Sequence, residues 1–140
     1  MIKLVRFSLI VLFSLTMLSW SSLGHRTIGL IADRHLSPKA KYAVQSLLPG
    51  SSLAEVSTWV DEVRGEAQYK STGPWHYINL PSGLDRKAFE AAVKGMNGAN
   101  VYEALNRMQQ PLRDPMATTE EKVIALKWLC RLRQTSATWK

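Results

Sequence analysis

Cysteine is almost absent from this chain of 140 residues, and the single Cys130 excludes any disulfide within the chain. The domain must therefore be held together by its hydrophobic core or by a metal ion. Internal repeats, low-complexity tracts and the alternating apolar pattern of half-buried strands are also lacking. The main apolar stretch, Phe7–Leu18, is shorter than the roughly 20 residues that a membrane-spanning helix requires. We therefore expect no stable membrane span.

The N-terminus has the pattern of a secretory signal peptide. Lys3 and Arg6 form a short basic region ahead of the apolar stretch, and Ser19 is a suitably small residue for a cleavage site. We predict a signal peptide over residues 1–19, cleavage before Trp20, and a location that is secreted or periplasmic. Met17 is larger than the residue usually found three positions before a cleavage site, so an uncleaved N-terminal anchor is the alternative.

Residues 20–140 carry a moderate positive charge and suit one modest domain. Of the 18 Lys and Arg residues, two lie in the leader, which leaves 16 against 11 Asp and Glu residues, a net charge of +5. Positive charge favours polyanions such as nucleic acid. A charge of this size is also ordinary for an exported domain, so it does not by itself select a partner.

Capping signals and apolar spacing predict an all-α fold. Ser37-Pro38 is typical of an N-cap followed by a proline at the first helical position. Ser52–Glu55 and Thr118–Glu121 are capping boxes. We expect helices over residues 23–34, 38–48, 53–63, 84–93, 99–113 and 119–129. Between them we expect a loop over 65–73, a short extended segment over 74–81 and a turn over 95–98.

A few side chains have the chemistry of zinc ligands, which are imidazole nitrogens and carboxylate oxygens. Cleavage before Trp20 would create a free amine that could chelate a metal together with the Trp20 carbonyl, and His25 follows closely. Asp61 and His76 are further candidates. Each also has a structural explanation: His25 as a surface or capping residue, Asp61 on an exposed helix face, and His76 as a core histidine bonded to backbone.

Four segments give the chain a family resemblance. They resemble the zinc-dependent single-strand-specific nucleases, three-zinc enzymes related in fold to zinc phospholipase C. The segments are Trp20–His25, Ile31–Pro38, Leu53–Arg64 and Pro74–Pro81. The resemblance runs from Trp20 to about Leu129, the N-terminal portion of such a domain. It implies an incomplete helical fold of that type, zinc as cofactor, and hydrolysis of phosphodiester bonds in single-stranded DNA and RNA.

The resemblance also implies roles for individual residues. Trp20 and His25 correspond to ligands of one zinc ion, and Asp61 and His76 to ligands of a neighbouring one. Arg64 corresponds to a basic residue beside the scissile phosphate, where it would offset growing charge. Tyr77 corresponds to an aromatic residue that stacks on an unpaired base. Asp61 and Arg64 are therefore the expected catalytic residues. The alternatives are a core aromatic for Tyr77 and a solvated helix-end charge for Arg64.

The last part of the chain departs from the family pattern. Arg131 stands where a histidine ligand is expected and Thr135 where an aspartate should bridge two zinc ions. The later ligands are absent, and residues 130–140 show neither helical periodicity nor family resemblance. We interpret this tail as the product of a frameshift or early stop, and we expect partial zinc sites at most and little or no activity.

The sequence allows three alternatives to a nuclease. The chain could be a non-catalytic module that binds single-stranded nucleic acid, which predicts salt-dependent binding without turnover. It could be a non-functional fragment without a stable fold. A zinc phospholipase C is a weaker alternative within the same superfamily.

Overall fold

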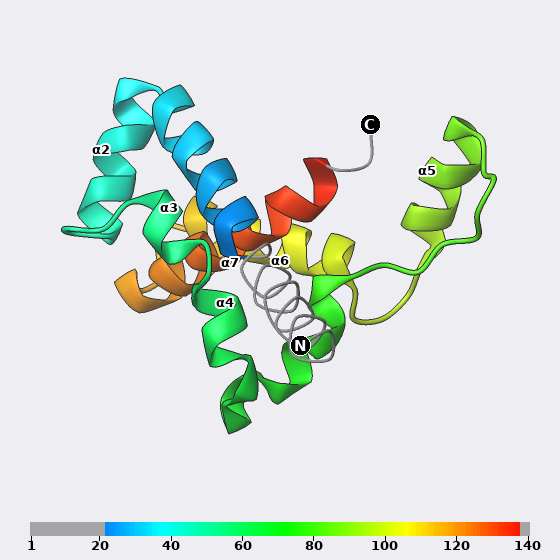
Figure 1. Ribbon diagram of the computed structural model, residues 1–140. Coiled ribbons are helices and arrows are strands. Elements are labelled where there is room, and N and C mark those ends of the chain that lie inside the picture. The colour runs from blue at the N-terminus through cyan, green and yellow to red at the C-terminus, as the bar shows by residue number, and fades with distance from the viewer. Residues whose placement is uncertain (1–21, 138–140) are drawn as a thin grey trace, which may run out of the picture.

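The computed structural model describes residues 22–137, and its side chains up to Leu132 (Figure 1). The described part is helical and contains no strand, which confirms the predicted all-α class. A first helix covers residues 22–35. The α-helices that follow are α2 (Pro38–Leu47), α3 (Leu53–Val56), α4 (Trp59–Glu62), α5 (Arg86–Gly95), α6 (Val101–Arg113) and α7 (Thr119–Ala137). Two 3-10 helices, η1 (Val63–Gly65) and η2 (Ala67–His76), follow α4.

The predicted caps are present. Ser37 accepts a hydrogen bond from the backbone N–H of Ala40 and precedes the proline that begins α2. Ser52 and Glu55 form a complete capping box at α3. The hydroxyl of Thr118 likewise accepts from the N–H of Glu121, whose carboxylate accepts from the Thr118 N–H. These bonds satisfy N–H groups that a helix start leaves unpaired.

Helix α7 lies at the centre of the fold, and it packs most extensively against α6. The buried residues of the main core cluster are Val60, Ala104, Met108, Ala125, Trp128 and Leu132, and Trp128 is only 1% exposed. Within the described residues, no helix is long and apolar enough to cross a membrane. Figure 1 shows α5 standing apart from this packed region, at the end of two extended connections.

The opposite side of α7 packs against a second cluster. Leu48, Leu53 and Val56 are buried there, and Val123 and Cys130 of α7 pack against them. Burial raises the pKa of the Cys130 thiol to about 12, so the group stays a protonated, apolar filler rather than a nucleophile. Because α7 is covered on both sides, it supports the N-terminal helices and the α4 region at once.

The helix over 22–35 touches the start of α3 closely. A Cβ added at Gly29 would lie 2.6 Å from the Cα of Ala54, so only glycine permits this approach. Four residues along the same helix, Asp33 accepts hydrogen bonds from the N–H groups of Leu53 and Ala54 at 3.3 and 3.4 Å. The carboxylate thereby caps α3 from another helix. These contacts fix the helix that carries His25.

Three expectations about the elements are wrong. The predicted helix over 53–63 is divided into α3, α4 and η1, and the Ser57 hydroxyl donates to the carbonyl of Ala54 at the first break. Most of the predicted loop over 65–73 lies in η2, which continues to His76, so the extended segment begins only at Tyr77. Helix α7 passes Leu129 and ends at Ala137. Burial of Trp128 and Leu132 against α6 maintains the helix beyond the point where apolar spacing became unclear.

Candidate functional site

Three of the four predicted zinc ligands lie together. His25 comes from the helix over 22–35, Asp61 from α4, and His76 is the last residue of η2. The Nε2 atom of His25 lies 3.5 Å from Oδ2 of Asp61, and Nδ1 of His76 lies 3.7 Å from Oδ1 of the same carboxylate. Trp20, the fourth predicted ligand, lies outside the described residues. Three separate segments therefore meet around one carboxylate.

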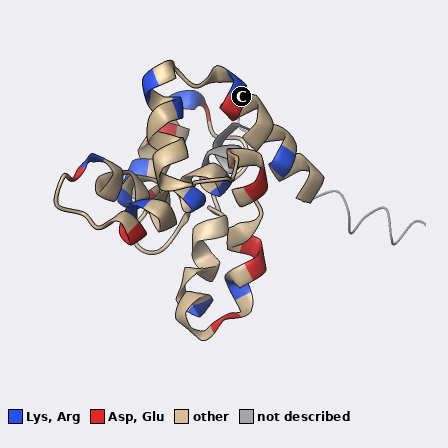
Figure 2. Ribbon diagram, turned by 90° about the vertical axis from the view of Figure 1, so that its left-hand side faces the viewer, with Lys and Arg blue, Asp and Glu red and all other residues tan. Residues whose placement is uncertain are grey.

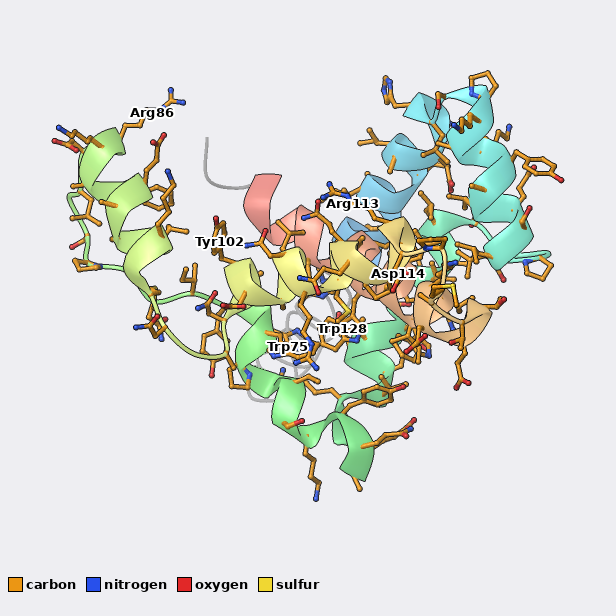
Figure 3. The ribbon with its side chains drawn as sticks, turned by 180° about the vertical axis from the view of Figure 1, so that it is seen from behind. Trp75, Arg86, Tyr102, Arg113, Asp114 and Trp128 are labelled. Atoms are coloured by element: carbon orange, nitrogen blue, oxygen red, sulfur yellow. The ribbon has the colours of Figure 1, made fainter. Side chains whose placement is uncertain are left out.

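Two tryptophans form the wall behind His76. The rings of Trp75 and Trp128 meet edge to face with centroids 4.9 Å apart, and Figure 3 shows them side by side. The His76 ring also contacts Trp128, with centroids 5.7 Å apart. Aromatic pairs prefer this edge-to-face geometry. Because Trp128 belongs to α7, the position of His76 depends on a helix that begins more than forty residues later in the chain.

Among the residues that the structure describes, the buried His76 imidazole has no hydrogen-bond partner at either ring nitrogen. Its side chain is 7% exposed, and it is not bonded to backbone as the structural alternative required. Burial lowers the pKa of His76 first, and the positive charge of Arg131 lowers it further, while Asp61 opposes both effects. The imidazole is thus favoured in its neutral form, the form in which a ring nitrogen can bind a metal.

Arg131 completes the cluster. Its Nε–H donates a hydrogen bond of 3.0 Å to Oδ2 of Asp61, and only 13% of its side chain is exposed. The same oxygen faces His25. Arg131 lies three residues after Trp128 on α7, so one face of this helix supplies both the aromatic wall and the charge. Asp61, with about a third of its side chain exposed, is therefore held by an ion pair.

This arrangement fits zinc only in part. The ring nitrogens of His76, which make no hydrogen bond within the described part of the chain, and the Asp61 carboxylate are suitable ligand atoms. A guanidinium, in contrast, has only donor hydrogens and remains charged, so Arg131 cannot ligate a cation. Among the side chains that the structure describes, no three His, Cys, Asp or Glu residues are grouped so that they could hold a metal ion. As they stand, the described residues do not fit a bound zinc ion.

The family model of the S1/P1 nucleases matches residues 20–133, which include every member of the cluster. The chain belongs to the S1/P1 nuclease family. It is 29% identical to Nuclease P1 of Penicillium citrinum over 117 residues, which cover 79% of this chain and 42% of that protein. It is 37% identical to Endonuclease 4 of Arabidopsis thaliana over 67 residues, 46% of this chain and 22% of that protein. Endonuclease 2 of the same plant is 38% identical over 65 residues, 44% of this chain and 22% of that protein.

The chain therefore spans less than half of the length of these S1/P1 relatives. Its matched region continues past Leu129, where the family resemblance read from sequence ended.

Two further residues that the S1/P1 resemblance selected lie beside the cluster. Arg64 is exposed in η1, and its charge contributes to the lowered pKa of His76. Tyr77 follows His76 directly, and 51% of its surface is exposed, so the alternative of a core aromatic does not hold. The Tyr77 carbonyl accepts a hydrogen bond from the N–H of Val101, which anchors the backbone while the ring remains accessible.

A shallow recess opens next to the carboxylate of this S1/P1-type cluster. It has a volume of about 270 Å³ and is lined by Asp61 with Ser22, Arg26, Thr58 and Glu62. Figure 2 shows basic and acidic residues interspersed over the ribbon instead of separated into two faces. Positive charge near the site is thus a local feature, contributed by Arg26, Arg64 and Arg131.

Sequence reasoning did not predict the contact between Arg131 and Asp61. The sequence did identify Arg131 as a departure from the S1/P1 pattern, and that departure was the available signal. Ligands of neighbouring metal ions lie close together, so a cation at an expected ligand position would lie near the carboxylate of Asp61, another expected ligand. The aromatic wall was also missed, since the pairing of Trp75 with Trp128 is a long-range contact.

Proposed function

We propose that the chain is the N-terminal part of a nuclease scaffold that binds single-stranded nucleic acid, in a family whose full-length members are zinc-dependent phosphodiesterases. The observation that carries this proposal is that His25 and His76 both face the carboxylate of Asp61. The names of the relatives, a nuclease and several endonucleases, support the substrate class.

The residues beside the cluster suit a single strand. The exposed ring of Tyr77 offers a face on which an unpaired base can stack, whatever its identity. A base inside a duplex is already stacked on both sides, so this contact favours single strands. Arg64 is placed to hold a backbone phosphate, since a guanidinium matches phosphate oxygens in geometry and charge.

The ion pair of Arg131 favours binding without turnover. Asp61 would have to coordinate zinc to take part in hydrolysis, and Arg131 already occupies one of its oxygens. We therefore expect phosphodiester cleavage by this chain to be absent or very slow. This observation supports the non-catalytic alternative over an active enzyme. Zinc dependence of the full-length family members and export of this chain through the leader are part of the same proposal, and both rest on family resemblance and sequence pattern.

The test measures binding and cleavage separately. Fluorescence anisotropy with a labelled single-stranded oligonucleotide, in EDTA, should give an affinity that falls with salt and exceeds the affinity for the matching duplex. Tyr77→Ala should weaken single-strand binding by about tenfold, since stacking on one base is worth about 1–3 kcal/mol. Tyr42→Ala is the matched control, because Tyr42 is 75% exposed and lies on α2, away from the cluster.

Four results would contradict the proposal. Equal binding of duplex and single strand would remove the substrate class. An unchanged affinity in Tyr77→Ala would remove the stacking contact. Robust zinc-dependent cleavage would refute the expected lack of turnover, and hydrolysis of phosphatidylcholine vesicles without oligonucleotide binding would favour the phospholipase alternative.

A further inference from the structure

We propose that Arg131 is a resident cation at Asp61, and that it closes the histidine–carboxylate cluster to zinc. The inference rests on the proposed function only in that it concerns the same site. It gives this chain a specific property: the cluster is complete without metal, and a single substitution on α7 opens it.

The geometry satisfies the carboxylate without a metal. Oδ2 of Asp61 accepts the 3.0 Å hydrogen bond from Arg131 and also faces His25, while Oδ1 faces His76. The two residues of the ion pair are seventy positions apart in the sequence. Their bond therefore joins α4 to α7, as a metal ion shared between the two helices would.

The charges around the carboxylate oppose a second cation. A zinc ion at Asp61 would lie next to the Arg131 guanidinium, and two positive charges at that distance repel each other strongly in a partly buried site. The dication would have to displace the arginine to reach the carboxylate.

Displacing Arg131 from Asp61 would be unfavourable. Its neighbours in α7, Trp128 and Leu132, are each only 1% exposed and fix the helix against the core. The arginine side chain is itself 13% exposed, so displacing it from Asp61 would leave a largely buried charge without a partner. Unpaired buried charges are strongly unfavourable. Zinc binding thus competes both with the repulsion and with this penalty.

The experiment compares metal binding by the full chain and its variants after removal of metal. Zinc affinity is measured by competition with a chromophoric chelator, and Co²⁺ absorption reports tetrahedral coordination. Arg131→His replaces a cation with a neutral imidazole and should raise zinc affinity at least about tenfold, because even residues outside the ligand shell change affinity 10–100-fold. Arg86→His on α5 is the matched control, since Arg86 is 93% exposed and remote from Asp61, and it should leave affinity unchanged.

Equal zinc affinity of the wild type and Arg131→His would overturn the inference. If Arg131→His loses its helical circular dichroism, Asp61→Asn in the wild type decides the matter. A closed cluster predicts that this change alters the affinity for zinc by less than about twofold, whereas a loss of tenfold or more would show that the wild-type carboxylate binds metal.

The result is independent of the test for nucleic-acid binding, which is made in EDTA. Failure of the Tyr77 experiment with a positive Arg131→His result would remove the proposed function and leave the closed cluster intact. The reverse outcome would leave the nucleic-acid scaffold intact and show that its cluster is open to zinc.

Discussion

Replacing Gly29 with alanine should destabilise the protein, although alanine is the better helix former. The new Cβ would lie 2.6 Å from the Cα of Ala54 and 2.8 Å from the carbonyl oxygen of Leu53. Both are backbone atoms, so no side chain can rotate out of the way. Comfortable contact between such atoms needs about 3.5–4.0 Å, which means that the helix over 22–35 must move by about 1 Å.

The magnitude follows from two opposing effects. Alanine inside a helix is favoured over glycine by about 1 kcal/mol. Overpacking a close contact typically costs about 1–3 kcal/mol, and the movement also stretches the two hydrogen bonds from Leu53 and Ala54 to Asp33, which are already 3.3 and 3.4 Å long. With about 1 kcal/mol for the weakened cap, the expected net loss is about 1–3 kcal/mol of unfolding free energy.

Urea unfolding followed by circular dichroism measures this loss. Hydrogen exchange locates it, because the amides of Leu53 and Ala54 should exchange faster in Gly29→Ala than in the wild type. Gly24→Ala is the matched control in the same helix, since no atom of the described residues lies within 4 Å of a Cβ added at Gly24. The control should be neutral or stabilised by up to about 1 kcal/mol. If Gly29→Ala is as stable as the Gly24 control, the close approach of the two helices is wrong.

Two further predictions concern the core and the caps. Trp128→Ala should lower the unfolding free energy by about 3–5 kcal/mol, because it empties the centre of the main cluster. Tyr42→Ala, at an exposed site, should change it by less than about 0.5 kcal/mol in the same urea titration. Similar losses in both variants would contradict the assigned core. Hydrogen bonds from the backbone and hydroxyl of Ser52 lower the pKa of Glu55 below its ordinary 4.5, so the stability from its ionised form is present above pH 4.5 and is lost as pH falls below that value. Glu55→Gln should flatten the acid limb of a melting-temperature profile between pH 7 and 3, and an unchanged limb would refute the capping contribution.

Local signals predicted the helices well wherever the cause of the structure is local. Ser37, the Ser52 capping box and the Thr118 capping box each act within four residues, and all three caps are present. The end of α7 was missed because it depends on distant packing, in which Trp128 and Leu132 lie against α6. The 3-10 segment that ends at His76 was missed for a related reason, since its turns carry no helix-period apolar pattern.

The candidate site was predictable as a set of residues and unpredictable as a geometry. Family resemblance selected His25, Asp61 and His76, and the structure brings these three together. The partner of the carboxylate was the missing part. Arg131 was visible as a departure from the family, yet its effect depends on the path of α7 past α4, which no spacing within the sequence determines.

Because the chain has a single cysteine, either a hydrophobic core or a metal ion must hold this domain together. The ion pair between Arg131 and Asp61 indicates how the core can do so without a metal. A carboxylate that lies between two imidazoles against an aromatic wall needs a positive partner, and a metal ion or a guanidinium can each provide it. An apolar residue in place of Arg131 would leave Asp61 without its cation and weaken the contact between α4 and α7. The arginine supplies the charge from within the chain, so the helices keep their arrangement while the carboxylate loses its availability as a ligand. The packing of the helices therefore does not require Asp61 to be free to bind a metal, and the Arg131 side chain of α7 determines whether it is.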